Sequence, residues 1–344
     1  MRKCKLIGTK VLSLMLVLLM TLISITALPA VAADKLTVIS SLSFPDAVFR
    51  AYVTSTVDTN KDGYLSESEA SAVSSIDLSN KGVTDLSGLM HFTNLQTLNC
   101  SNNALTKLKL ASNTKLYNLN CGSNSIETLN LESNTALQVL DCSNNKLQSL
   151  DVSANTSLEM FACTGNQLTI LDLSNNPSLI LVKCDSNKLS TLNLAGSARL
   201  AILYCSNNEL ATLDISANTA LAQLFAQNNR LSSLALGTNT ALSKLNVSDN
   251  KLVKLDISAN TNLTELSCNN NSLTMLDAYS NTKLTSLSCT GNSYDVTVDA
   301  NVSFDLNTLP TPLSSTRVSN MKGGTVNQLG ILTFDAGSTE FTYV

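Results

Sequence analysis

Leucine recurs every 21 residues along most of this chain, and this fixed period limits the possible folds more than any other feature. An asparagine follows each of these ten leucines eight residues later. The unit, as at 137–157, is L-x-x-L-x-C-x-x-N-x-L-x-x-L-D-L-S-x-N-T-x. The register leucines are Leu95, Leu116, Leu137, Leu158, Leu179, Leu200, Leu221, Leu242, Leu263 and Leu284. A strict period of this length is typical of a solenoid, in which each repeat forms one coil.

Each repeat supplies apolar side chains that no single coil could bury. Positions 1, 4, 6, 11, 14 and 16 of the unit are apolar, so stacked coils would bury them in one continuous core. The asparagine at position 9 would turn the chain and bond backbone groups left open by the bend. With one coil above the next at ~4.8 Å, ten coils form a rod of about 50 Å. Two leucine phrases leave little room for helix in 21 residues, so we expect strands and turns to dominate.

This pattern resembles that of bacterial leucine-rich-repeat surface proteins, in the short subclass with two leucine phrases per coil. The resemblance covers residues 73–304, with an opening coil of 22 residues at 73–94 and then ten coils of 21. It implies a leucine-rich-repeat solenoid, conventionally classed as an α/β superhelix and here dominated by β-structure and turns. It also implies binding to another protein, usually in adhesion or host contact, without identifying the partner.

Eight cysteines occupy position 6 of the unit, and Ala226 and Val247 fill that position in the other two coils. The eight are Cys100, Cys121, Cys142, Cys163, Cys184, Cys205, Cys268 and Cys289. Stacking places equivalent Cβ atoms ~4.8 Å apart and parallel, farther than the ~3.5–4.5 Å that a disulfide prefers. We therefore expect buried, reduced thiols that act as small apolar side chains. Disulfides and a thiolate metal site are the alternatives.

A twelve-residue segment before the array, residues 58–69, matches the EF-hand calcium loop at every key position. In that loop, oxygens come from positions 1, 3, 5, 7 and 9, and a glutamate at position 12 binds with both oxygens. Gly63 stands at position 6, where the loop turns sharply. The expected Ca²⁺ ligands are Asp58, Asn60, Asp62, the carbonyl of Tyr64, Ser66 (directly or through water) and Glu69. A plain acidic surface turn is the alternative.

The residues around this loop predict a small helical, EF-hand-like cap over 34–72. Ser66 and Glu69 form a capping box for a helix that runs to about Val73. The phrase Phe44-Pro45-Asp46 followed by such a loop resembles the N-terminal module of the same bacterial proteins. We expect Ca²⁺ to stiffen the cap over the first coil, with a Kd of order 10⁻⁴–10⁻³ M. The apolar face before the loop consists of Phe44, Val48, Phe49, Tyr52 and Val53.

Positions 3 and 5 of the unit should point outward from the strands, and in the middle coils they are apolar or aromatic. The expected partner-binding residues are Val139, Met160, Leu181, Ile202, Tyr204 and Phe225. An exposed apolar patch with a polar rim is typical of a protein-binding site. Packing against the C-terminal tail, or ordinary surface variation, is the alternative. The second phrase, with Ser, Thr, Asp and Asn at its outward positions, reads as solvated; a calcium ladder there is the weaker alternative.

The two ends of the chain differ from the array. Residues 1–33 combine four basic residues with an apolar run from Val11 to Ile23, which predicts a secretory signal peptide and a secreted or cell-surface protein. Without this leader, 18 basic residues face 26 acidic ones, a net charge of −8, which disfavours a nucleic-acid partner. We expect no membrane span after cleavage. Residues 305–344 leave the register and predict a short β cap, or the start of a further domain.

Composition argues against catalysis. His91 is the one histidine, and histidine is the usual proton carrier near neutral pH. We therefore expect a protein-binding module with a calcium-stabilised cap and no enzyme activity. A passive spacer within a larger surface protein is the main alternative, and a hydrolase using paired carboxylates is a more remote one.

Overall fold

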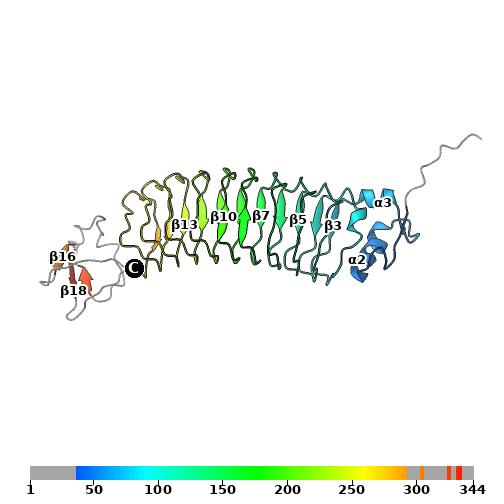
Figure 1. The fold of residues 1–344 in the computed structure, drawn as a ribbon, viewed down its shortest axis with the longest axis horizontal. Helices are drawn as coiled ribbons and strands as arrows, with labels where there is room; N and C mark the ends of the chain where they lie inside the picture. The colour runs from blue at the N-terminus through cyan, green and yellow to red at the C-terminus, as the bar shows by residue number, and fades with distance from the viewer. Residues whose placement is uncertain (1–35, 293–302, 306–323, 327–330, 335–344) are drawn as a thin grey trace, which may run out of the picture.

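The computed structural model shows a small N-terminal cap followed by a rod of stacked coils (Figure 1). The structure describes residues 36–292 and three short strands at 303–305, 324–326 and 331–334. The prediction of a leucine-rich-repeat solenoid with a small helical N-terminal cap is confirmed. The signal peptide expected at 1–33 lies outside the described residues, as does the end of the array at 293–302.

One parallel sheet of eleven strands runs the length of the array, and each coil contributes one strand of three residues. Neighbouring strands pair in an unbroken 21-residue register after the first step, for example Leu203 with Leu224. The strands are β3 (Ser75–Asp77), β4 (Thr97–Asn99), β5 (Asn118–Asn120), β6 (Val139–Asp141), β7 (Met160–Ala162), β9 (Leu181–Lys183), β11 (Ile202–Tyr204), β12 (Gln223–Phe225), β13 (Lys244–Asn246), β14 (Glu265–Ser267) and β15 (Ser286–Ser288).

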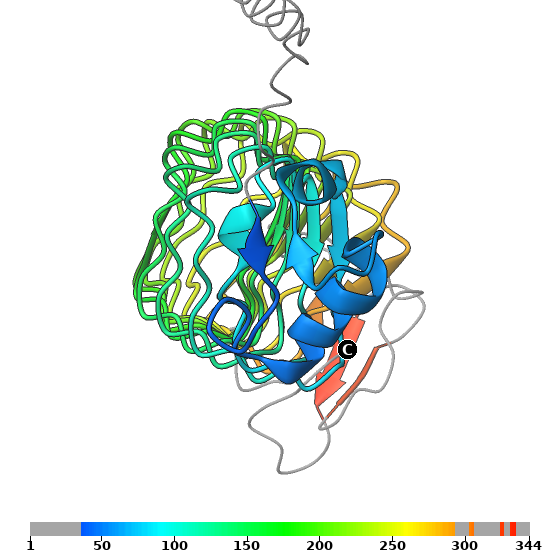
Figure 2. The ribbon, with the colours of Figure 1, turned by 90° about the vertical axis from the view of Figure 1, so that its right-hand side faces the viewer.

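The second leucine phrase forms the other wall of the rod, which Figure 2 shows nearly end-on with the coils superimposed. Among the described residues of this wall, β8 (Ile170–Asp172) and β10 (Thr191–Asn193) form the one strand pair, with an isolated bridge between Leu108 and Leu129. The expected dominance of strands and turns therefore holds, with the strands concentrated on one wall. Helix within the described array is limited to a single 3₁₀ turn, η2 (Leu89–His91).

The leucines of the register form the core, as their spacing predicts. From Leu95 to Leu263 every register leucine is fully buried, whereas Leu284 is only partly buried. Burying a leucine side chain contributes roughly 1.5–3 kcal/mol. Because each side chain packs against the coils above and below, this stabilisation belongs to the stack and not to a single repeat.

The cap consists of β1 (Thr37–Val38), α2 (Ala47–Tyr52), the π-helical turn η1 (Val53–Val57), β2 (Tyr64–Leu65) and α3 (Glu67–Ala72). Asp46 caps α2, because its Oδ1 accepts hydrogen bonds from the backbone N–H groups of Val48 and Phe49. Phe44, Phe49 and Val53 are fully buried, but Val48 is 38% exposed. The apolar face of this segment is therefore narrower than the sequence predicts.

Asp46 also joins the cap to the array. Its Oδ2 accepts hydrogen bonds from the backbone N–H and the hydroxyl of Thr84 in the opening coil, at 2.9 and 3.1 Å. One buried carboxylate thus fixes both the start of α2 and the seam between cap and solenoid.

A three-stranded antiparallel sheet follows in the sequence, in the order β16 (Ser303–Asp305), β18 (Ile331–Phe334), β17 (Gly324–Val326). The β17–β18 pair is a hairpin of the kind expected in this region. The rest of 305–344, including Val318, Phe341 and Tyr343, lies outside the described residues. The assignment of this region as a cap remains a prediction.

Candidate binding face and calcium loop

Four aliphatic side chains form a continuous row across the middle of the eleven-stranded sheet. Strand pairing places Val139 beside Met160, Met160 beside Leu181, and Leu181 beside Ile202. Met160 is 48% exposed and the other three are half-buried. We call these four residues the apolar row.

Tyr204, in the same strand as Ile202, and Phe225, in the next strand, extend this surface at position 5 of the unit. Their rings stack with centroids 4.6 Å apart and planes within 6° of parallel. The ammonium of Lys183 lies 5.7 Å from the centroid of the Tyr204 ring, on the preceding coil. The apolar row and the two rings together form the binding face, so the structure brings the six predicted partner residues onto one wall.

Polar side chains border the binding face along the rod. The apolar row ends at Asn118 on one side and at Gln223 on the other, as the strand register shows. Beyond Gln223, Lys244 and Glu265 form an ion pair of 2.7 Å across neighbouring strands. An apolar centre with a polar rim is the arrangement that protein interfaces use.

The cysteines stand in one column behind this sheet. All eight are buried, and none forms a disulfide. Burial raises the pKa of Cys100 to about 12, and it raises the pKa of Cys121 well above its usual value. The Cys142 thiol donates a weak hydrogen bond to the carbonyl of Ala162 in the next coil, at 3.4 Å. These thiols stay protonated and pack as small apolar groups, so they lack the thiolate that nucleophilic catalysis needs.

The loop at 58–69 is ordered by its own carboxylates and amides. Asp58 is buried; its Oδ2 accepts a hydrogen bond from Gly63 N–H at 3.1 Å, while its Oδ1 has no hydrogen-bond partner. The Oδ1 of Asn60 accepts from the N–H of Asp62, and an oxygen of Asp62 accepts from the N–H of Tyr64. Both side chains remain on the exposed surface of the loop.

Glu69 turns its carboxylate back toward the loop and the start of α3. One oxygen accepts hydrogen bonds from the N–H and the hydroxyl of Thr59, and the other accepts from the N–H and the hydroxyl of Ser66. The expected capping box is therefore present. These bonds, that from the Ser66 N–H foremost, lower the pKa of Glu69 to about 2. Within the described residues, no three His, Cys, Asp or Glu side chains converge as a ready-made metal site.

His91 has a structural environment. It is half-buried, its ring lies 5.8 Å from that of Phe44, and burial lowers its pKa. The imidazole is therefore neutral at physiological pH and helps to pack the cap on the opening coil.

A second column of buried asparagines was not anticipated from the sequence. At position 19 the side-chain amide donates to two carbonyls of the preceding coil, as Asn155 does to Leu131 and Asn134 at 3.1 and 2.8 Å. Asparagine recurs at position 19 in eight of the ten coils, with Ser197 and Val302 in the other two, so the signal is present in the sequence. A repeating pattern shows which positions recur but not which side of a turn is buried.

No helix in the described part of the chain is both long and apolar enough to cross a membrane.

These features define a leucine-rich-repeat protein built from 21-residue coils, and the chain is similar to the bacterial internalins. Residues 44–176 match the family model for the leucine-rich-repeat domain of the endo-beta-N-acetylglucosaminidase EndoS. The functional domain of InlJ from Listeria monocytogenes, which includes a cysteine ladder, is 34% identical with a TM-score of 0.71, over 76% of this chain and 58% of that one. The chain thus spans less than two-thirds of the InlJ structure.

Two further structures share the fold. Internalin InlF from Listeria monocytogenes is 21% identical with a TM-score of 0.50, over 77% of this chain and 94% of that one. The effector YopM from Yersinia pestis is 27% identical with a TM-score of 0.57, over 64% of this chain and 61% of that one. A search of curated proteins found no match.

Proposed function

We propose that this chain is a secreted or cell-surface binding module that holds a protein partner on the binding face. The observation that favours this function is the apolar row of Val139, Met160, Leu181 and Ile202, continued by the stacked rings of Tyr204 and Phe225. Contiguous apolar and aromatic side chains with a polar rim supply the desolvated centre that dominates protein-binding energy.

The orientation of the rings favours a protein over a carbohydrate. Sugars bind aromatic side chains mainly through the ring face, but Tyr204 and Phe225 cover one face of each other and Lys183 lies over Tyr204. The outward surface therefore presents ring edges. Edge contacts suit the aliphatic and aromatic side chains of a polypeptide.

The comparisons support a surface-exposed, host-interacting protein. The chain is similar to InlJ and shares its fold with other internalins. The matching family model describes the leucine-rich-repeat domain of an enzyme. A passive spacer is the competing function. Partner binding that is lost when the binding face is substituted would favour a binding module over a spacer.

The test uses the double substitution Leu181→Asp and Tyr204→Ala. We expect the wild-type chain to retain surface-labelled host-cell proteins after crosslinking. We expect the variant not to retain them. Ile170→Asp is the matched control, because Ile170 is 60% exposed on the opposite wall. Capture of the same proteins by all three folded chains would remove the binding face from consideration.

We propose, second, that the loop at 58–69 binds Ca²⁺. The observation in its favour is the buried Oδ1 of Asp58, which has no hydrogen-bond partner although buried carboxylate oxygens are normally satisfied. Asn60, Asp62, the carbonyl of Tyr64, Ser66 and Glu69 would supply the other oxygens, which are the ligands that Ca²⁺ prefers. Bound Ca²⁺ would neutralise the acidic loop and stiffen the cap.

Calorimetry tests the calcium proposal. We expect a Kd of order 10⁻⁴–10⁻³ M for the wild type, and no binding heat for Asp58→Asn, which removes the charge but keeps an oxygen for the Gly63 hydrogen bond. Equal heats for both chains would contradict the assignment.

A further inference from the structure

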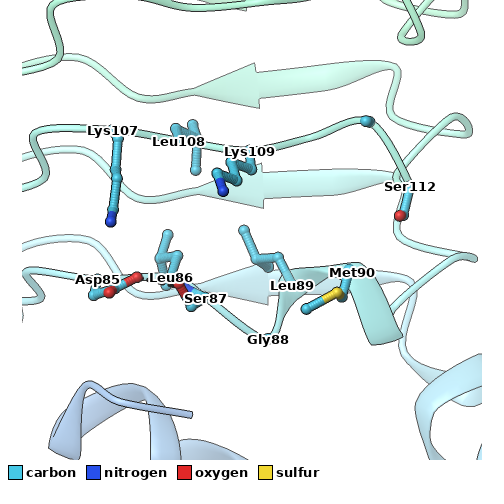
Figure 3. Close-up of a pocket in the computed structure, with 11 residues that line it drawn as sticks. Asp85, Leu86, Ser87, Gly88, Leu89, Met90, Lys107, Leu108, Lys109 and Ser112 are labelled. Carbon is cyan, nitrogen blue, oxygen red and sulfur yellow. Dashed lines mark hydrogen bonds between the residues drawn. The ribbon is translucent and has the colours of Figure 1, made fainter. Parts of the chain in front are cut away.

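A pocket of about 230 Å³ opens on the wall formed by the second leucine phrases, between the opening coil and the first regular coil (Figure 3). Residues 85–90 form one side, and residues 107–112 form the other. The binding face and the calcium loop do not share these residues.

The pocket exists because the opening coil departs from the register. Its extra residue is accommodated beside η2, where Gly88 has a φ of +108°. The bridge that Leu108 makes in this wall is to Leu129 in the following coil. Leu108 therefore pairs with the coil that follows it, and the pocket lies on its other side, toward the opening coil.

The floor of the pocket is apolar. Leu86, Leu89 and Leu108 are buried core residues that line it, and Met90 stands at the edge with 59% of its side chain exposed. A methionine thioether adapts its shape to an apolar ligand better than branched side chains do.

Two ammonium groups stand above this floor. Lys107 and Lys109 extend from the first regular coil toward the pocket, as Figure 3 shows. Among the described residues, the ion pairs within 4.0 Å are Arg230–Glu209 and Lys244–Glu265, so neither lysine belongs to one. Asp85 is the one acidic residue of the lining, and it accepts a hydrogen bond from Ser87 N–H at 2.7 Å. The lining carries a net charge of +1.

Lys109 departs from a pattern that most of the regular coils follow, and Ala235 is the other exception among the described coils. Lys109 occupies position 15, where an asparagine or aspartate usually accepts a hydrogen bond from the N–H two residues later. Asp151 does so for Ser153 at 2.8 Å, and Asp214 does so for Ser216 at 2.9 Å. A lysine side chain has no acceptor, so the turn after Lys109 forms without this side-chain hydrogen bond. Departures from a locally consistent pattern are expected where a residue serves a function.

We propose that this pocket binds a small monocarboxylate with a short apolar body. The carboxylate would lie between Lys107 and Lys109, and the body would cover Leu86, Leu89 and Met90. One negative charge matches the net charge of the lining. The volume is below the ~300–1,000 Å³ typical of sites for drug-sized molecules, so it fits a chain of about six carbons.

The experiment is a titration of the folded chain with sodium hexanoate, with methionine methyl groups labelled with ¹³C and read by NMR. We expect the Met90 methyl resonance to shift in a saturable way, with a Kd of order 1 mM. Hexanamide has the same body without the charge, and we expect it to bind at least five-fold more weakly. No saturation by hexanoate up to 20 mM, or equal binding of hexanamide, would overturn the proposal.

Substitutions locate the charge requirement. Lys109→Gln and Lys107→Gln should each weaken hexanoate binding at least five-fold with unchanged thermal melting. The matched control is Lys254→Gln, because Lys254 occupies the same position of the unit as Lys107, seven coils further along. An equal loss in this control would show non-specific attraction and contradict a site at the pocket.

Discussion

Two columns of asparagine run through the array, and they differ in how fully their hydrogen bonds are satisfied. At position 9 the amide uses both ends: in Asn145 the nitrogen donates to the carbonyls of Cys121 and Cys142, and the oxygen accepts from Ile126 N–H. At position 19 the nitrogen is satisfied, but the buried oxygen of Asn155 has no partner. At position 9 the side-chain amide thus uses both its nitrogen and its oxygen. At position 19 only the nitrogen forms hydrogen bonds, and these connect one coil to the previous one.

The chain itself contains the natural variant of the second column. Ser197 replaces the asparagine, and its hydroxyl oxygen lies 3.1 and 3.3 Å from the two equivalent carbonyl oxygens, those of Leu173 and Asn176, which share its single proton. Asn155→Ala should therefore destabilise the array by about 2–4 kcal/mol, because two buried carbonyls lose their donor. Asn155→Ser should cost less than half as much. Urea unfolding monitored by circular dichroism measures both, and equal losses would contradict the hydrogen-bond explanation.

Among the elements, the helical cap depends on two carboxylates with lowered pKa values. Burial raises the pKa of Asp46, but hydrogen bonds from Thr84, Phe49 and Val48 lower it by more, so it lies below its usual value. The pKa of Glu69 is about 2, against an ordinary value of 4.5. Both groups stabilise the cap in their ionised form.

Acid should therefore loosen the cap before it affects the leucine core. Because the pKa of Glu69 is lower in the folded state, its contribution is complete above pH 4.5 and is lost as the pH falls toward 2. We expect the amide resonances of Thr59 and Ser66, which donate to this carboxylate, to shift through that range. Glu69→Gln should remove the transition, and a transition that persists in this variant would assign it to other groups.

The seam between cap and array should be equally sensitive to one glycine. A Cβ added at Gly88 would lie 2.5 Å from a ring carbon of Phe44 and 2.8 Å from the carbonyl oxygen of Ser43, at a φ of +108°. We expect Gly88→Ala to cost at least ~2 kcal/mol, with cleavage by protease first in residues 36–72. Gly82→Ala is the control, because that position has positive φ but open space and should cost only about 1 kcal/mol. Similar cleavage of both variants would show that backbone strain alone is responsible.

At the scale of the whole molecule, the eight buried thiols report the integrity of the stack. The mature folded chain should not react with a thiol reagent at pH 8, because burial raises the cysteine pKa values and excludes the reagent. After denaturation all eight should react. Fewer than about two reactive thiols would contradict a reduced column, and rapid reaction before denaturation would contradict its burial.

The period of the leucines was enough to predict the coil, its buried positions and the outward side chains of the strands. The period does not predict contacts that join distant parts of the chain. An example is the Asp46–Thr84 hydrogen bond, which links residues 38 positions apart in different elements. The stacked geometry of Tyr204 and Phe225 follows from the register, but the placement of Lys183 over the ring needs coordinates. The extra residue of the opening coil is visible in the sequence, but the pocket depends on the backbone path around Gly88, which a pattern does not show.

The stacking of coils, each held only by its neighbours, also determines how the molecule responds to tension. A pull along the rod would peel coils away singly, and each released coil of 21 residues would add about 70 Å of extended chain. A rod built in this way lengthens in steps and dissipates work under tension, while coils further along keep their shape.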